Sequence, residues 1–154
     1  IVGEVVNKLR IWLRGYLTMI AIDFCVYGTV FHLLKVPYAP VLAAVAAVGI
    51  LLPYIGPVSS ALLTVLVTLA VGGPAVSALQ IAGIVGIYVI HNGIIEQFFI
   101  YPWIIGESLG MTTLETIIVV LLGGILAGIP GMIFALPAAA VIKYLVPQIY
   151  RCWK

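Results

Sequence analysis

The sequence predicts an all-α integral membrane protein made of two halves, each a long helix followed by a broken helical hairpin. Two observations predict this class. Hydrophobic residues make up 64% of the 154 residues and charged residues only 8%, whereas soluble domains carry about 25% charged residues. In addition, the stretch from Val36 to Ile95 contains no Asp, Glu, Lys or Arg. A chain of this composition is expected to lie in a lipid bilayer and to cross it more than once.

The expected elements follow one another along the chain. They are an interfacial amphipathic helix at 1–13, a span at 13–34, a broken hairpin at 37–72, a span at 75–101, a broken hairpin at 112–147 and a cytoplasmic tail at 148–154. Apolar and charged residues alternate at helical spacing in the first segment, which fits either an interfacial helix or the end of a soluble one. Basic residues flank both ends of the chain, so the positive-inside rule places both ends in the cytoplasm.

The first hairpin is predicted by the motif Leu52-Pro53-Tyr54-Ile55-Gly56-Pro57. Proline lacks the N–H group and clashes with the preceding turn, so a helix must break there. Its two arms, 38–52 and 58–72, have 15 residues each, fewer than the roughly 17 that a span needs. The hairpin is therefore either re-entrant or a pair of bent spans. Pro53, Tyr54, Gly56 and Pro57 are candidates for the transport path, and a plain turn at the membrane surface is the other reading.

A second break is predicted at Gly128-Ile129-Pro130-Gly131, and Gly128, Pro130 and Gly131 are further transport-path candidates. A shift of 75 residues places Gly56 on Gly131. Each half crosses the membrane an odd number of times whether its hairpin is re-entrant or spanning. The two halves would then form an inverted repeat, as in many secondary transporters.

Four polar residues stand out within the predicted spans. Asp23 lies near the middle of its span, where a carboxylate is costly unless it is protonated, paired or wet, so it should face other helices. His91, Asn92 and Glu96 are expected to form a polar group at a helix end, where contact with lipid headgroups is the favoured interpretation and proton coupling the other. All four are transport-path candidates.

These features together resemble the autoinducer-2 exporter family of bacterial permeases. The resemblance covers nearly the whole chain and is carried by Leu13-Arg14-Gly15, Val36-Pro37-Tyr38, Leu52 to Pro57, Ile94-Ile95-Glu96, Pro102, Gly106, Gly123-Gly124, Gly128, Gly131-Met132 and Ala135-Leu136-Pro137. It implies a longer protein with further spans ahead of this part. It also implies transport of a furanosyl signalling molecule, or exchange of sodium or protons. The chain departs from the family at Thr112-Thr113, where a His-Pro pair is usual, and Asp23 matches no family motif.

We therefore expect a multi-pass permease of the bacterial inner membrane that exports a small polar solute or exchanges an ion by alternating access. The alternative is a structural or accessory membrane subunit. No catalytic motif is present: the serines lack a Gly-x-Ser-x-Gly context, and His32 and His91 are not a ligand set. No enzyme activity, cofactor, metal or nucleic acid is expected. The expected partners are the bilayer, the solute or ion, the missing N-terminal half and, in a homo-oligomer, further copies of the chain.

Overall fold

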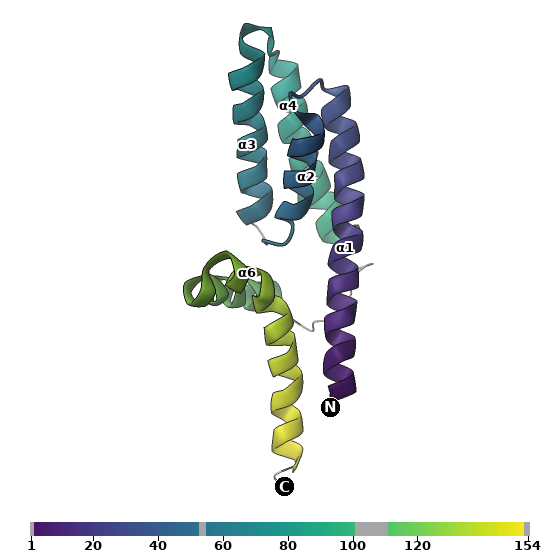
Figure 1. Cartoon of the computed structure of the whole chain (residues 1–154), viewed down its shortest axis with the longest axis vertical. Helices are drawn as coiled ribbons and strands as arrows, with labels where there is room; N and C mark the ends of the chain where they lie inside the picture. Colours follow the sequence, from purple (N-terminus) through teal and green to yellow (C-terminus); the bar gives the residue numbers. More distant parts are fainter. Residues whose placement is uncertain (1, 53–54, 101–110, 153–154) are drawn as a thin grey trace. The chain divides into compact units, whose positions relative to one another are not determined.

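The computed structural model describes residues 2–52, 55–100 and 111–152, and these residues form helices joined by short turns, with no strand among them (Figure 1). Within this described part, four helical segments are long and apolar enough to cross a membrane. They are Gly3–Leu33, Ile55–Ala75, Ala78–Ile100 and Leu114–Pro147. The prediction of an all-α membrane protein is confirmed. The motif residues Pro53 and Tyr54, and residues 101–110 with the Pro102 and Gly106 of the family pattern, lie outside the described residues.

The chain divides into two compact units, one formed by residues 1–16 and 105–154 and the other by residues 17–104. Helix α1, Val2–Leu33, runs without interruption through the segments 1–13 and 13–34 and contributes to both units. It ends in a turn where Lys35 and Tyr38 adopt positive φ angles. Gln80 Nε2 donates to the carbonyl oxygens of Leu34 (2.8 Å) and Lys35 (3.2 Å). These bonds satisfy acceptors that a helix C-terminus leaves unpaired.

Helices α2, Ala39–Gly49, and α3, Ile55–Gly72, form the first hairpin (Figure 1). The arms are unequal, because α2 has 11 residues and α3 has 18. The two helices approach closely at Gly49 and Gly56. A Cβ atom on Gly56 would overlap the backbone oxygen of Gly49, so this crossing requires glycine. The hydroxyl groups of Ser59, Ser60 and Thr64 donate to carbonyl oxygens one turn earlier in α3.

The next transmembrane segment combines two kinds of helix. A short 3-10 turn, η1 (Gly73–Ala75), precedes helix α4, Ala78–Ile87. The Ser77 side chain caps α4 by accepting a hydrogen bond from the backbone N–H of Gln80. From Tyr88 to Ile100 the chain continues as a π-helix, η2. In a π-helix the backbone hydrogen bonds join residues five apart, and such segments are often found at functional sites.

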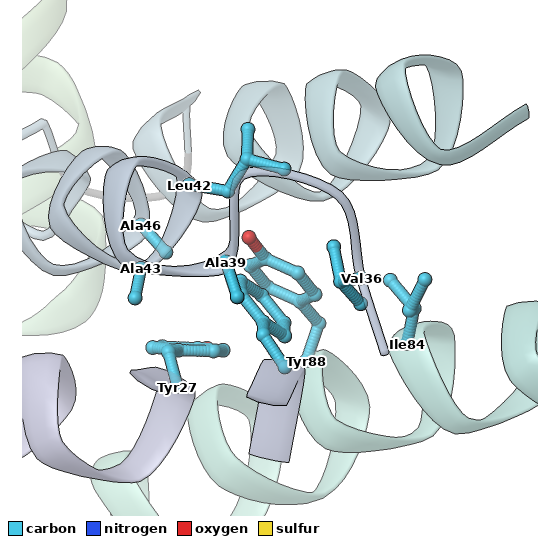
Figure 2. Close-up of a cluster of buried hydrophobic side chains, with 9 residues drawn as sticks. Tyr27, Val36, Ala39, Leu42, Ala43, Ala46, Ile84 and Tyr88 are labelled. Atoms are coloured by element: carbon cyan, nitrogen blue, oxygen red, sulfur yellow. The ribbon is translucent and has the colours of Figure 1, made fainter. Parts of the chain in front are cut away.

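The hydrophobic core of the unit formed by residues 17–104 lies where α1, α2 and α4–η2 meet. It consists of Tyr27, Phe31, Val36, Ala39, Leu42, Ala43, Ala46, Ile84 and Tyr88. Figure 2 shows the Tyr27 and Tyr88 rings among the small alanine side chains of α2. The ring centroids of the two tyrosines are 4.8 Å apart. Alanines on α2 leave room for these rings, and this packing fixes the position of α1 against η2.

Helix α6, Thr113–Cys152, is a second broken hairpin within the other unit. Its backbone leaves the helical conformation at Ala127 and Gly128, and Gly128 has φ +62° and ψ −144°. The break therefore lies at the start of the predicted segment 128–131, where Pro130 cannot bond to the preceding turn. A Cβ atom on Gly131 would overlap the carbonyl oxygen of Gly123. Both hairpins thus use a close glycine contact next to a proline-containing break.

Thr112, at which the chain departs from the family pattern, caps the start of α6. The backbone N–H of Thr112 donates to Glu115 Oε2 (2.7 Å), and the N–H of Glu115 donates to Thr112 Oγ1 (3.3 Å). This reciprocal pair is a capping box. Glu115 also accepts from Lys143 Nζ at 2.9 Å on the other arm of α6. Glu115 is therefore an exposed residue that caps the start of α6 together with Thr112.

Candidate functional site: a buried polar cluster

Two ionisable side chains from different transmembrane helices form a buried pair. His91 Nε2 on η2 and Asp23 Oδ1 on α1 are 2.8 Å apart and hydrogen bonded. The two side chains are only 2% and 1% exposed. The Tyr27 ring stands edge-on to the imidazole, with centroids 5.4 Å apart and planes at 88°, and so restricts its rotation. Asp23 faces other helices, as the cost of a carboxylate in a bilayer requires.

Glu96 joins this pair because η2 is a π-helix. In an α-helix, residues five apart point about 140° away from each other. With hydrogen bonds between residues five apart, they lie one above the other on the same face. His91 and Glu96 are five apart, and both are buried. One oxygen or nitrogen atom from each of Asp23, His91 and Glu96 lies within 4.8 Å of the others.

A chain of hydrogen bonds holds Glu96 in place. The Tyr27 hydroxyl donates to Asn92 Oδ1, and Asn92 Nδ2 donates to Glu96 Oε2 at 2.6 Å. Since α1 supplies Tyr27 and Asp23, and η2 supplies the other three residues, the group ties two helices together. We call Asp23, Tyr27, His91, Asn92 and Glu96 the polar cluster. The headgroup interpretation is wrong for His91 and Glu96, which are buried against α1.

The polar cluster contains more acidic than basic side chains. It contains two carboxyl groups, and the imidazole of His91 forms the one ion pair of Asp23 among the described residues. No Lys or Arg occurs between Val36 and Ile95. Asp23 Oδ2 is buried and has no hydrogen-bond partner in the described part of the chain. Burying two carboxyl groups this close together in an apolar environment is costly unless other groups compensate their charge.

Polar side chains continue from the polar cluster onto α3. Ser60, Thr64 and Thr68 follow one another at four-residue spacing, and all three are buried. The Thr64 and Tyr88 hydroxyls are 3.1 Å apart and hydrogen bonded. Tyr88 in turn stacks against Tyr27. Hydroxyl groups therefore extend inward from the first hairpin to Tyr27. Sequence reasoning overlooked Tyr27, Tyr88 and Thr68, although the spacing of Ser60, Thr64 and Thr68 is visible in the sequence.

The remaining transport-path candidates are placed in different parts of the fold. Gly56 and Pro57 lie in the first turn of α3, and Gly56 is buried against Gly49. Gly128 forms the break in α6, and Pro130 and Gly131 follow it in the second arm. The structure thus brings together Asp23, His91, Asn92 and Glu96. The hairpin residues form two separate sets, one in each unit.

Comparison with known proteins supports a role in transport. The sequence model of the AI-2E family transporters matches residues 1–151. The chain is 30% identical to "Putative transport protein YrrI" of Bacillus subtilis over 96% of this chain and 40% of that protein. It is 33% identical to "Putative transport protein sll0063" of Synechocystis over 73% of this chain and 27% of that protein. "Putative transport protein YueF" of Bacillus subtilis is 31% identical over 77% of this chain and 30% of its own length.

The chain therefore spans between 27% and 40% of the length of these relatives. No solved structure matches it significantly. The family model covers almost the whole chain, and the described helices include four that are long and apolar enough to span a bilayer. This chain is a multi-pass membrane protein that belongs to the AI-2E transporter family.

Proposed function

We propose that the chain is part of a permease of the bacterial inner membrane that moves a small polar solute by alternating access. A furanosyl signal of the autoinducer-2 class is the solute that the family name suggests. Exchange of a cation is the second candidate, favoured by the two carboxyl groups buried in the polar cluster. Because the chain covers less than half of its relatives, the solute path would be completed by the rest of the protein.

The observation that carries this proposal is the burial of Asp23, His91 and Glu96 between helices long enough to span a bilayer. Ionisable residues at such positions are costly and mark substrate or ion pathways in transporters. A purely structural subunit would be more stable with apolar residues there, because burying charged groups usually brings little net stability. The hydroxyl groups on α3 offer further hydrogen-bond partners to a polar solute.

The two broken hairpins supply a mechanism. The first turn of a helix has N–H groups without partners inside that helix. At the start of a helical arm such groups would favour an anionic or hydroxyl-rich solute. Free carbonyl oxygens at the end of an arm can hold a cation. We propose that rocking of one hairpin against the other alternates access, with the close contacts at Gly56 and Gly131 holding the two arms of each hairpin together.

Transport by the full-length protein in proteoliposomes tests the proposal. Asp23→Asn should lower the rate of solute or cation flux at least tenfold, whereas Glu115→Gln should leave it unchanged. The control is well matched: it removes an exposed carboxylate but keeps the capping box, because Gln replaces Glu in that motif. Wild-type flux equal to that of empty liposomes, for both solutes and cations, would favour the accessory subunit instead.

A further inference from the structure

The polar cluster has the composition of a metal site. Among the described residues, Asp23, His91 and Glu96 are the group of three ligating side chains that lie close enough to hold one ion. They offer two carboxylate oxygens and one imidazole nitrogen, the ligand types found in zinc and manganese sites. We propose that this group binds a divalent first-row transition metal, with Zn²⁺ or Mn²⁺ as the probe.

The spacing of the three donor atoms is close to that of a coordinated ion. An ion about 2.0–2.2 Å from each ligand in tetrahedral geometry separates the ligand atoms by roughly 3.3–3.6 Å. His91 Nε2 and Asp23 Oδ1 are 2.8 Å apart, and all three donor atoms lie within 4.8 Å of one another. Side-chain shifts of about 1 Å are therefore enough to place the ion between them. Neutral imidazole would bind the ion through Nε2 in place of its bond to Asp23.

The charge balance favours a divalent ion over a monovalent one. The charges of two carboxylates, a neutral imidazole and one divalent ion sum to zero. A group of zero net charge is the least costly to bury in an apolar environment. Sodium would leave a net charge of −1 and prefers oxygen to nitrogen ligands. Asp23 Oδ2, which is buried without a hydrogen-bond partner among the described residues, would gain either the ion or a bound water as a partner.

Residues next to the proposed ligands already orient two of them, Glu96 and His91. Asn92 donates to Glu96 Oε2 and is itself held by the Tyr27 hydroxyl, while the Tyr27 ring packs edge-on to His91. Metal sites depend on such outer partners, whose loss typically weakens affinity about 10- to 100-fold. Tyr27 and Asn92 are thus positioning residues for the proposed site. The proposal concerns binding, and it holds or fails independently of transport.

Isothermal titration of the full-length protein in detergent, without an affinity tag, with Zn²⁺ and Mn²⁺ tests this proposal. The wild type should bind one ion per chain at this site, and Mg²⁺ or Na⁺ at equal concentration should not displace it. Asp23→Asn, His91→Gln and Glu96→Gln should each weaken binding at least tenfold. Glu115→Gln should bind as the wild type does. A Cys25→Ser background removes the exposed thiol as an alternative ligand.

Folding is followed in parallel, so that a misfolded variant is not mistaken for a lost ligand. The melting temperature of each variant is measured without metal, and Glu96→Gln, which keeps the shape of the side chain, serves when the other variants unfold. A folded wild type that binds neither ion would overturn the proposal. Binding that survives all three substitutions in folded protein would also overturn it, because the ion would then occupy another site.

Discussion

Tyr27 connects the core of its unit to the ionisable groups, so its ring and its hydroxyl can be distinguished by mutation. The ring packs against Phe31, Tyr88 and His91, and the hydroxyl donates to Asn92. Phenylalanine at this position would keep the packing and remove the donor. Asn92 Oδ1 would lose its hydrogen-bond partner, and Asn92 would hold Glu96 less firmly.

We expect Tyr27→Phe to lower the stability of the protein by about 1 kcal/mol, the usual net value of a hydrogen bond. Tyr88→Phe is the matched control, because it removes a buried hydroxyl that bonds to Thr64 instead. Thermal unfolding in detergent should show a similar loss for both variants. Only Tyr27→Phe should weaken Zn²⁺ binding by tenfold or more. Equal zinc affinity in the two variants would show that Tyr27 does not position Glu96.

At the level of the elements, part of the polar cluster could be predicted from the sequence and part could not. The burial of Asp23 and the carbonyl bonds of the α3 hydroxyls follow from the cost of polar groups in hydrocarbon, and both were predictable. The sequence grouped His91 with Glu96 at a helix end, but it did not predict that both side chains are buried on the face that meets Asp23. This arrangement depends on the change from α- to π-helix at Tyr88, and apolar periodicity carries no signal for that change in so uniformly hydrophobic a segment.

The glycine contacts of the two hairpins give a prediction at the level of elements. Gly56→Ala and Gly131→Ala would each push a methyl group into a backbone oxygen, of Gly49 and Gly123 respectively. Forcing atoms into a packed contact costs about 1–3 kcal/mol, and backbone cannot move aside as a flexible side chain can. Both variants should therefore unfold at lower temperature than the wild type.

Gly86→Ala is the control for these two variants, because a Cβ atom at Gly86 would have nothing within 4 Å. Inside a helix, alanine is more stable than glycine by up to about 1 kcal/mol of folding free energy. The Gly86→Ala variant should therefore be as stable as the wild type or slightly more stable. Unchanged melting temperatures for Gly56→Ala and Gly131→Ala would mean that the helices separate at these points in the membrane.

At the level of the whole molecule, each of the two units contains a helical hairpin of the same kind. In each hairpin the break between the two arms lies beside a proline, and a glycine of one arm contacts a glycine of the other. The sequence predicted these hairpins from Pro and Gly positions, and the structure shows the breaks within the described residues. Whether the two halves are inverted in the membrane depends on their crossings, which local backbone geometry does not determine. Residues at the two breaks therefore provide the test.

Cysteine labelling from each side of the membrane measures this directly. In full-length protein with Cys25 and Cys152 replaced by Ser, single cysteines at Ile55 and Ile129 mark the two breaks, where both native side chains are exposed. Ser77→Cys, an exposed position in the turn before α4, gives the rate of a surface turn. If the halves are inverted and line one path, the two positions should label more slowly than Ser77→Cys, from opposite sides, and substrate should protect both. Labelling of both from one side, at the rate of Ser77→Cys and without protection, would mean that the breaks are surface turns and that alternating access does not run through them.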